Sequence, residues 1–475
     1  MINNHLFDAA TYAARRARLQ KEVGNGLILL PGNDESPMNY LDNTYPFRQD
    51  SHFLYFAGYA QPGLALLIDA DENTTTLFGD DLSIDYIVWM GPQPSIAEMA
   101  QRIGIDRTAP YAELAARLQS AKAGGRPIHY LPPYRGDNSI RLSKWLNSPV
   151  DELAANSSET LIKAVVAQRI IKSDEEVAEL EQAVNFTGDM HLAVMKAAKP
   201  GITEAALAGI AAGIAKAHGT QPGYGIILTV NGQTLHNHYH GNTLTSGKLV
   251  LGDFGADSRM FYAGDITRTF PVDPTFTPKQ RDIYNLVLQM QLSAIDALKP
   301  GVRYYDVHLL SARVMVEGLK ALGLMKGNTD NALSSGAFAL FFPHGLGHML
   351  GLDVHDLEDV GEQYVGYAGE LERSKQFGLK SLRLGRAMQP GFVLTVEPGI
   401  YFIPELMDLW QQQGKFTDFI NYDKLQAYRD FGGIRIEDNV LITADSHRIL
   451  GNPIPKTIEA VEAVRKEHFP LLVGA

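Results

Sequence analysis

Cysteine is absent from all 475 residues of this chain, and its absence limits the chemistry available to the protein. Without thiols the fold has no disulfide, and no cysteine can act as a nucleophile or hold a metal ion. Any metal site must therefore be built from histidine, aspartate and glutamate. A chain without disulfides is also typical of a reducing compartment, which predicts a cytoplasmic location.

The sequence also lacks a basic run and a long hydrophobic run. Its formal net charge is −12, whereas nucleic acids and anionic membranes both need a basic surface on their partner. The N-terminal MINNHLFDAATYAARRARLQ has no apolar stretch of signal-peptide length, and no other segment is apolar enough to cross a bilayer. These absences predict a protein that binds neither nucleic acid nor membrane.

A change in sequence pattern near residue 165 indicates two domains. Before it, apolar runs such as GLILLPG, LALLIDA and IHYLPP mix with helical patterns such as residues 95–101, which predicts a small α/β domain over residues 1–165. Ser173 and Glu176 then form a capping box that begins a long amphipathic helix. Residues 155–172 are therefore expected to connect this domain to a second one over residues 166–475.

The second domain repeats a short pattern. KAAKPGITEAAL near residue 200 is matched one hundred positions later by DALKPGVRYYDV, and both follow a long amphipathic helix. Thr277, Pro278 and Gln280 cap the second helix as Ser173 and Glu176 cap the first. Because a Gly-rich, sheet-like stretch follows in each case, the pattern predicts two similar α+β units that face one another.

Three histidines, His344, His348 and His355, lie within twelve residues in FFPHGLGHMLGLDVHD. The first two have the spacing of a zinc-protease helix, but Gly345 stands where that motif needs a glutamate, and Gly347 does not suit a helix interior either. Any single histidine could be a hydrogen-bonded core residue. Three so close together indicate a site whose other members lie elsewhere in the chain.

Four acidic residues stand in strand-like segments, where a buried carboxylate is costly unless it is paired. Asp253 and Asp265 flank a turn near residues 257–258 in VLGDFGADSRMFYAGDITRTFPV, which predicts a β-hairpin that brings the two carboxylates across from each other. Glu397 in GFVLTVEPGIYFI and Glu437 in GGIRIEDNVLIT are lone acids in apolar runs. Turn capping is the alternative interpretation of the two aspartates.

These acids and one of the histidines form a predicted set of metal ligands: Asp253, Asp265, His348, Glu397 and Glu437. So many oxygens suit two divalent ions per chain, Mn(II) first and Co(II), Fe(II) or Zn(II) as alternatives, better than one tetrahedral structural zinc. Two such ions can hold a bridging hydroxide that attacks a carbonyl, and they stabilise the oxyanion that forms. The sequence therefore predicts a metal-dependent hydrolase.

The blocks PHGLGHMLGLDVHD, LTVEPGIYFI, GDITRTFPV and FGGIRIEDNV resemble the pita-bread metallopeptidases, the family of methionine aminopeptidase, aminopeptidase P and prolidase. The N-terminal YPFRQDSHFLYFAGYAQPG is similar to the leading domain of the proline-specific members. The resemblance spans nearly the whole chain. It implies an α+β fold with a C-terminal pita-bread domain, like that of creatinase and methionine aminopeptidase, after a smaller α/β N-terminal domain of the aminopeptidase P/creatinase type.

The resemblance also implies a role for each ligand. Asp253 would bind one metal ion, His348 and Glu397 would bind the other, and Asp265 and Glu437 would bridge the two. Glu397 would in addition take the proton from the metal-bound water, a role that needs a pKa tuned by the neighbouring cations.

The remaining site residues are implied to contact substrate. His236 and His355 correspond to family histidines that hold the substrate carbonyl and stabilise the tetrahedral intermediate. His344 lines the pocket or is structural. Arg435 lies two residues before Glu437 on the same expected strand and can reach the pocket, and a surface salt bridge is its alternative.

Three details of the family pattern stay open in the sequence. The hairpin from Asp253 to Asp265 is one residue longer than is usual, and the additional residue is expected in the turn or in a bulge. His236 has the expected spacing to Asp253, with His238 as the alternative. Arg383 in KSLRLGRAMQPG matches the prolidase arginine that grips the carboxylate of a C-terminal proline, with Arg386 as the alternative.

Long insertions on both sides of Glu397 favour an Xaa-Pro dipeptidase within this family. An Xaa-Pro aminopeptidase that acts on longer peptides is the alternative, and a non-catalytic pita-bread binding module is a third, although all five ligand positions are filled. The expected partners are therefore proline-containing di- or oligopeptides. The resemblance further implies a homodimer or homotetramer built through the N-terminal domain.

Overall fold

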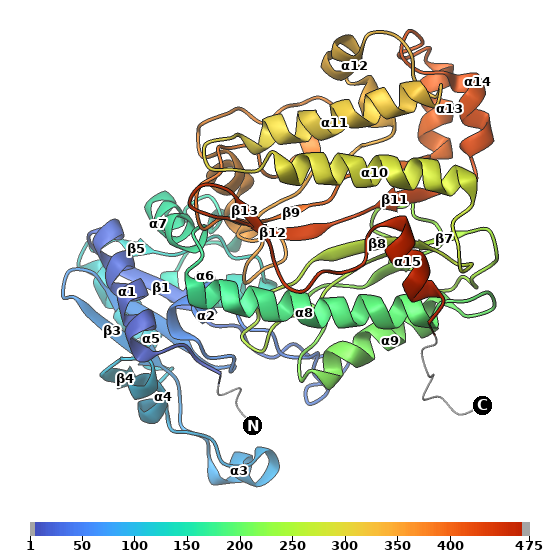
Figure 1. The fold of residues 1–475 in the computed structure, drawn as a ribbon. Coiled ribbons are helices and arrows are strands. Elements are labelled where there is room, and N and C mark those ends of the chain that lie inside the picture. The colour runs from blue at the N-terminus through green and yellow to red at the C-terminus, as the bar shows by residue number, and fades with distance from the viewer. Residues whose placement is uncertain (1–4, 468–475) are drawn as a thin grey trace. The chain divides into compact units, whose positions relative to one another are not determined.

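A computed structural model describes residues 5–467, which form two compact units (Figure 1). Unit 1 runs to Arg169 and also contains Leu357–Tyr364. Unit 2 runs from Ile170 to Asp356 and continues from Val365. Each unit has its own sheets and helices.

A five-stranded mixed sheet lies at the centre of unit 1, in the order β4-β3-β2-β1-β5. Its strands are β1 (Leu27–Pro31), β2 (Ala65–Asp69), β3 (Thr74–Phe78), β4 (Arg107–Ala109) and β5 (Ile128–His129). The apolar runs GLILLPG, LALLIDA and IHYLPP supply β1, β2 and β5, as predicted. β1 and β2 are almost wholly buried because helices cover both faces of the sheet.

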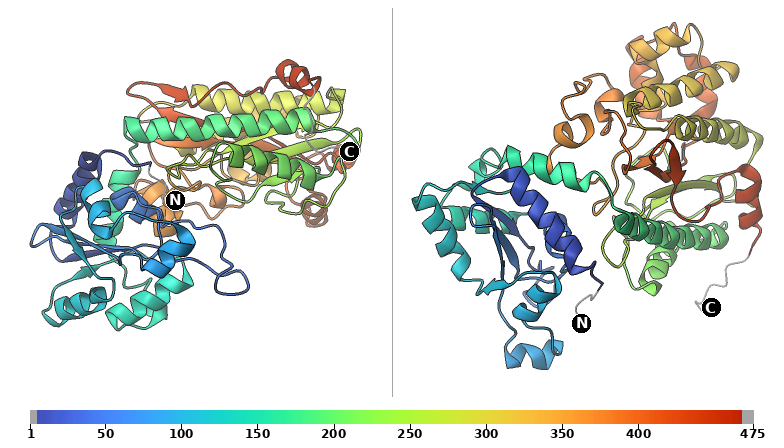
Figure 2. Two further views of the ribbon diagram at one scale, coloured as in Figure 1. Left: turned by 90° about the horizontal axis from the view of Figure 1, so that it is seen from below. Right: turned by 60° about the vertical axis from the view of Figure 1, so that its left-hand side comes forward.

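The described part of unit 1 also has seven α-helices: α1 (Ala9–Val23), α2 (Ser51–Ala57), α3 (Ile84–Met90), α4 (Ile96–Arg102), α5 (Glu113–Ala123), α6 (Gly136–Leu146) and α7 (Glu159–Arg169). The helix expected near residue 95 is α4, which begins with a capping box of Ser95 and Glu98. Most of the segment expected to connect the domains is helical, because α7 occupies it. Helix α3 buries none of its residues and lies apart from the sheet of its own unit (Figures 1 and 2).

Unit 2 contains three small antiparallel sheets. They are β6-β7-β8 (Ile227–Thr229, Leu249–Phe254, Ile266–Pro271), β13-β12-β9 (His447–Ile449, Asp438–Ile442, Val393–Val396) and β10-β11 (Gly399–Tyr401, Gly433–Arg435). Hydrogen bonds join the sheets, since Glu437 N donates to Thr267 O over 3.1 Å and Thr269 Oγ1 donates to Arg435 O over 2.9 Å.

Up to residue 467, where the described residues end, unit 2 also has eight α-helices: α8 (Asp174–Ala197), α9 (Glu204–Ala217), α10 (Pro278–Asp296), α11 (Tyr304–Ala321), α12 (Thr329–Ser335), α13 (Pro404–Gln412), α14 (Tyr422–Leu425) and α15 (Ile458–Arg465). The pairs α8/α9 and α10/α11 run along the strands (Figure 1). Both predicted capping boxes are present, at Ser173 with Glu176 and at Thr277 with Gln280, and Pro278 occupies the first turn of α10.

The predicted repeat in unit 2 is confirmed by matching hydrogen bonds one hundred residues apart. After the first Lys-Pro-Gly, Gly201 N donates to Leu244 O over 2.9 Å. After the second, Gly301 N donates to Met388 O, also over 2.9 Å. In each copy a later extended segment therefore pairs with the turn between the two helices. The two copies thus share a backbone arrangement as well as the Lys-Pro-Gly sequence.

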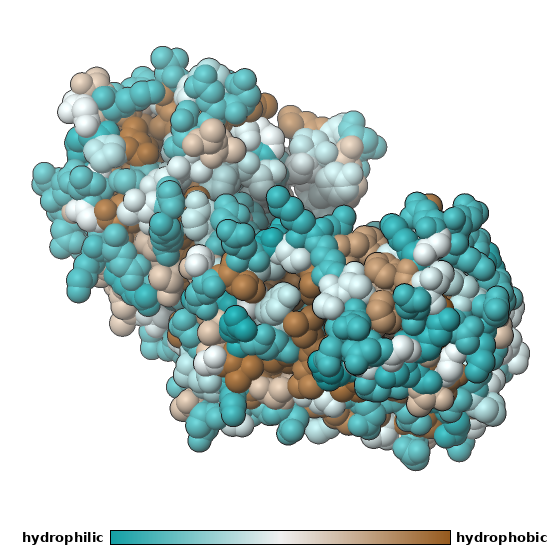
Figure 3. All heavy atoms as spheres, turned by 90° about the horizontal axis from the view of Figure 1, so that it is seen from above, coloured by the Kyte–Doolittle hydropathy of each residue, from teal (hydrophilic) through white to brown (hydrophobic). Residues whose placement is uncertain are grey.

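Among the described residues, no helix is long and apolar enough to cross a membrane. Hydrophilic side chains cover most of the face drawn in Figure 3, with smaller apolar areas between them.

Candidate metal centre

The hairpin of β7 and β8 brings Asp253 and Asp265 to one side of the sheet. Asp253 pairs directly with Thr267, and Asp265 lies two residues before Thr267. The two aspartates are therefore diagonal neighbours, and the prediction that they lie directly across from each other is wrong. The Tyr224 hydroxyl lies 2.7 Å from Asp253 Oδ1 and 2.5 Å from Asp265 Oδ1. Both aspartates are buried, so they converge on one small volume.

The turn of this hairpin contains its additional residue. The pairing of Phe254 with Ile266 and that of Asp257 with Ala263 have the same register, which leaves no bulge between them. Ser258 N then donates to Tyr262 O over 2.7 Å and closes the turn. The alternative of a bulge is therefore wrong.

His348 is carried by a segment that pairs with β9. Its backbone is held on both sides, because His348 N donates to Thr395 Oγ1 over 3.1 Å and Thr395 N donates to His348 O over 2.9 Å. A Cβ at Gly347 would lie 2.2 Å from Thr395 O, so only glycine permits this approach. As a result, His348 Nε2 lies 3.3 Å from Asp265 Oδ2 and 3.6 Å from Glu397 Oε1.

The two glutamates stand at breaks between strands. Glu397 lies between β9 and β10, and Glu437 lies between β11 and β12. The expectation that Arg435 and Glu437 share one strand is therefore wrong, since β11 ends at Arg435. Because neither glutamate belongs to a regular strand, its side chain need not follow the alternation of a strand face. Glu437 contacts Thr267 of β8, and Glu397 lies near His348.

Glu437 provides the clearest sign that the site fits a cation. Its Oε2 accepts a hydrogen bond from Thr267 Oγ1 over 2.6 Å, but its buried Oε1 has no hydrogen-bond partner among the described residues. A buried carboxylate oxygen without a partner is costly. Asp265, His348 and Glu437 each offer a ligand atom, and these atoms all lie within 4.8 Å of one another. These residues fit a divalent cation.

The pKa values of these carboxyl groups also show that their negative charges are not fully compensated by neighbouring residues. Burial raises the pKa of Glu397 to about 7, and burial with the nearby Asp265 charge raises that of Glu437 well above its ordinary value. Burial also raises the pKa of Asp253. Burial opposes ionisation of Asp265 too, but hydrogen bonds from His348 and Tyr224 and the charges of His348 and His355 together outweigh it and lower the pKa of Asp265. A bound cation would remove this mutual repulsion.

Arg435 lies inside the site, so its interpretation as a surface salt bridge is wrong. Only 3% of the residue is exposed, and its guanidinium pairs with Asp253 and donates from Nη1 to the Tyr401 hydroxyl over 2.9 Å. The same hydroxyl lies 2.8 Å from His344 Nε2. His344 Nδ1 is 4.0 Å from Glu397 Oε2, so His344 borders the cluster.

Two tyrosines belong to the site and were missed from the sequence. Tyr224 joins the two aspartates, and Tyr401 joins Arg435 to His344. Tyr401 lies four residues after Glu397 in GFVLTVEPGIYFI, and this proximity could have identified it from the sequence. Tyr224 lies in QPGYGIIL with no other polar side chain after the glutamine, so only the spatial pairing identifies it.

His355 and His236 lie near the carboxylates. The rings of His355 and His348 have centroids 4.3 Å apart in an edge-to-face arrangement, and the charge of His355 affects the pKa of Asp265. Burial lowers the pKa of His236, and the charges of Asp253, Arg435 and Arg383 all act on it.

The structure also places the alternatives of the two open assignments. His238 packs against Gly225, where an added Cβ would lie 3.1 Å from His238 Cε1. Arg386 Nη2 lies 3.3 Å from Glu370 Oε1, and its guanidinium is 5.6 Å from the centre of the Phe392 ring. His236 and Arg383 stay the predicted substrate contacts, with His238 and Arg386 as the alternatives.

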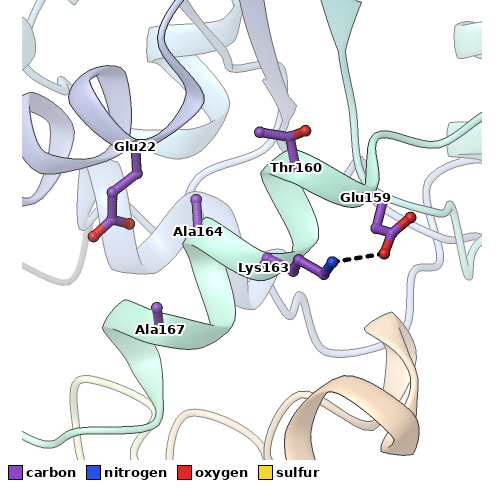
Figure 4. A pocket seen from close by; sticks show the side chains of 6 residues that line it. All are labelled: Glu22, Glu159, Thr160, Lys163, Ala164 and Ala167. Carbon is purple, nitrogen blue, oxygen red and sulfur yellow. Dashed lines mark ion pairs between the residues drawn. The ribbon is translucent and has the colours of Figure 1, made fainter. Parts of the chain in front are cut away.

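A groove in unit 1 has different chemistry. It has a volume of about 450 Å³ and lies between α1 and α7, lined by Glu22, Glu159, Thr160, Lys163, Ala164 and Ala167 (Figure 4). Its one lysine pairs with Glu159 over 2.8 Å. No histidine lines it, so it does not compete with the carboxylate cluster as a catalytic centre.

Two models of known protein families match this chain. The model of "Metallopeptidase family M24" matches residues 178–444, and that of "Aminopeptidase P, N-terminal domain" matches residues 12–129. The chain is 34% identical to the Xaa-Pro dipeptidase of Homo sapiens, covering 96% of this chain and 93% of the relative. It is 35% identical to a probable Xaa-Pro aminopeptidase of Talaromyces stipitatus, covering 95% and 90%.

A solved structure is similar over almost the full length. Zn-substituted Escherichia coli aminopeptidase P in complex with product has a TM-score of 0.79 and 29% identity, covering 97% of this chain and 99% of that chain. The expected fold class, an α+β protein with a pita-bread domain after a smaller N-terminal domain, is confirmed.

Proposed function

Since the chain belongs to metallopeptidase family M24, we propose that it hydrolyses the Xaa-Pro bond of dipeptides at a centre of two divalent metal ions. The observation that carries the metal centre is the buried Oε1 of Glu437, which has no hydrogen-bond partner among the described residues. Around it lie the buried carboxylates of Asp253 and Asp265 and the half-buried one of Glu397. In this proposal Asp253 would hold one ion, His348 and Glu397 would hold the other, and Asp265 and Glu437 would contact both. The domains are residues 1–165 and 166–475.

When bound, the two ions supply a nucleophilic water at neutral pH and charge for the developing oxyanion. The protein side chains then have separate tasks. Glu397, whose pKa burial raises to about 7, accepts a proton from the attacking water. His355 and His236 donate hydrogen bonds to the substrate carbonyl as it becomes tetrahedral.

Arg435 and His344 shape the substrate side of the centre in this proposal. Arg435 neutralises Asp253, and the Tyr401 hydroxyl fixes the orientation of both Arg435 and His344. Burial lowers the pKa of His344 to about 3, so His344 stays neutral and can line a pocket for an uncharged proline ring. Neutral His344 and charged Arg435 thus give the substrate side of the centre one uncharged and one charged group.

Arg383 decides the preferred substrate length. It lies close enough to affect His236, so its guanidinium is well placed to bind the free carboxylate of the proline in Xaa-Pro. A tripeptide has its carboxylate one residue further out and would not satisfy Arg383. Loss of such a charge-assisted pair should lower catalytic efficiency on dipeptides by roughly a hundredfold.

Hydrolysis of Gly-Pro, Ala-Pro and Ala-Pro-Ala by wild type, Arg383→Ala and Arg386→Ala tests this assignment. We expect wild type to prefer the dipeptides and Arg383→Ala to lose that preference. Arg386→Ala is the matched control, because its partner is Glu370 and it should keep the wild-type pattern. A wild-type preference for the tripeptide, without a dipeptide-specific loss in Arg383→Ala, would instead support an Xaa-Pro aminopeptidase.

The aminopeptidase alternative has its own support, because a relative of that name is as similar as the human dipeptidase. A non-catalytic binding module is the third alternative. Metal analysis of the purified protein separates it from both enzymes, since a binding module would carry no stoichiometric ions. Mn(II) is the proposed ion on the basis of the oxygen-rich ligands, with Co(II), Fe(II) and Zn(II) as alternatives.

A homodimer is the proposed assembly. Helix α3 exposes Ile84, Val88, Trp89 and Met90, with 85% of Trp89 accessible. An exposed apolar helix of this kind is typical of a protein interface. Sedimentation of wild type and of Trp89→Ser tests the proposal, and a monomer at every concentration would contradict it. The cytoplasmic location stays a prediction from composition.

A further inference from the structure

His191 lies on α8, outside the set of predicted ligands, and bonds to the backbone beside two of them. It is fully buried, and its Nε2 lies 3.1 Å from Phe254 O and 2.9 Å from Ile266 O. Phe254 directly follows Asp253, and Ile266 directly follows Asp265. One imidazole therefore spans the two strands at the positions next to both aspartates.

The contacts of His191 determine the tautomer of its imidazole ring. Both partners of Nε2 are carbonyl oxygens, so Nε2 must carry the hydrogen and donate it to both. The imidazole also stacks on the Phe254 ring, with centroids 4.0 Å apart and an angle of 8° between the planes. Burial, with Arg268 nearby, lowers the pKa of His191 to about 3, so the ring stays neutral.

Other side chains hold the same part of the hairpin. One turn earlier on α8, Thr187 Oγ1 accepts a hydrogen bond from Ala256 N over 2.9 Å. On the opposite side, Asn439 Oδ1 accepts from Asp265 N over 3.0 Å, and Asn439 Nδ2 donates to Asp265 O over 2.5 Å. The hairpin is thus held from α8 and from β12, and His191 donates to the backbone of both of its strands.

We infer that His191 is a positioning residue that sets the separation of the Asp253 and Asp265 carboxylates and thereby the affinity of the centre for its second metal ion. The inference rests on the proposed metal centre. Phe254 and Ile266 also face each other in the β7–β8 ladder, so without the imidazole this pair would be held by the backbone pairing alone. The strands could then move apart where the Asp253 and Asp265 carboxylates must converge. Side chains that orient metal ligands typically change metal affinity by 10–100-fold when they are replaced.

The chain offers a matched control in His308. It is an equally buried histidine on α11 in the second copy of the repeat, but neither of its ring nitrogens has a hydrogen-bond partner among the described residues. Leucine has a volume similar to that of histidine, so either replacement changes the packing of a helix core by a similar small amount. Only the change at His191 removes a hydrogen-bond donor from the hairpin.

The experiment measures Mn(II) binding by calorimetry and by metal content after gel filtration, for the full chain as wild type, His191→Leu, His191→Gln and His308→Leu. We expect two ions for wild type and His308→Leu. We expect a loss of at least tenfold in affinity for the second ion in His191→Leu, and partial recovery in His191→Gln, whose amide can donate near the position of Nε2. Circular dichroism checks that each variant is folded.

The outcomes separate this inference from the proposed function. If wild type binds no stoichiometric Mn(II), Co(II) or Zn(II), the proposed metal centre fails and this inference fails with it. If wild type binds two ions and folded His191→Leu binds both with unchanged affinity, the positioning role of His191 is refuted while the centre stands. An equal loss in His308→Leu would also refute it, because general loosening of the core would then explain the effect.

Discussion

Replacing His308 by leucine should make unit 2 more resistant to acid. His308 is fully buried on α11, where the rings of Phe342 and Phe338 lie 5.1 and 6.0 Å from it. Burial lowers its pKa from 6.5 to about 4. The unfolded chain therefore binds a proton near pH 6.5, whereas the folded chain binds it only near pH 4. Stability from this residue is complete above about pH 6.5 and is lost as the pH falls toward 4.

The size of the effect follows from the pKa of His308 in the unfolded and folded chain. A tenfold change in proton affinity corresponds to about 1.36 kcal/mol, so lowering the pKa from 6.5 to about 4 costs about 3 kcal/mol at pH 4 and about 2 kcal/mol at pH 5. Leucine cannot take up a proton, so this loss disappears in the variant. At neutral pH the change should be small or stabilising, because it also removes two buried ring nitrogens that have no hydrogen-bond partner among the described residues.

Urea unfolding at pH 7, 6, 5 and 4.5 measures this difference, with chelator present so that metal release does not contribute. Phe338→Leu is the control, since it alters packing against the same histidine without removing a titrating group. It should lower the free energy of unfolding by the same amount at every pH. The reasoning is refuted if wild type and His308→Leu lose stability in parallel between pH 7 and 4.5.

Three further outcomes are expected. Removing divalent ions should abolish hydrolysis and lower the melting temperature, and Mn(II) should restore both; full turnover by chelated protein would contradict the metal mechanism. Lys172→Met should cost about 3–5 kcal/mol of unfolding free energy, because Lys172 and Asp356 form a 2.7 Å ion pair with both side chains 1% exposed, and a double variant with Asp356→Leu should recover most of that loss. Tyr224→Phe should weaken Mn(II) binding roughly tenfold without unfolding the chain, as measured by calorimetry, since it removes the hydroxyl between the two aspartates.

Local rules were enough for much of the fold. Capping boxes at residues 173–176 and 277–280 begin α8 and α10 as predicted, because the cap is satisfied by side chains three residues apart. The apolar runs became strands, and the repeated Lys-Pro-Gly marks two copies of one backbone path. These features depend on neighbours in the sequence, so a single sequence contains them.

Local rules failed where pairing between distant segments decides the geometry. The position of Asp265 relative to Asp253, the end of β11 at Arg435 and the turn of the hairpin were each misjudged or left open. Register follows from hydrogen bonds across strands and from the surrounding packing, which a pattern along one strand does not contain.

The sequence by itself determined which residue types are available for chemistry: no thiol, a net charge of −12, and lone acids and clustered histidines in apolar segments. Only the tertiary structure decided how they combine. In the folded chain Tyr224, Tyr401 and His191 lie around one site, although they are up to 210 residues apart in the sequence. Folding also buries Arg435 against Asp253. It also left one oxygen of Glu437 without a partner among the described residues. The physical reason is that burial and distance, not residue type, set whether a carboxylate is stable alone, paired or in need of a cation.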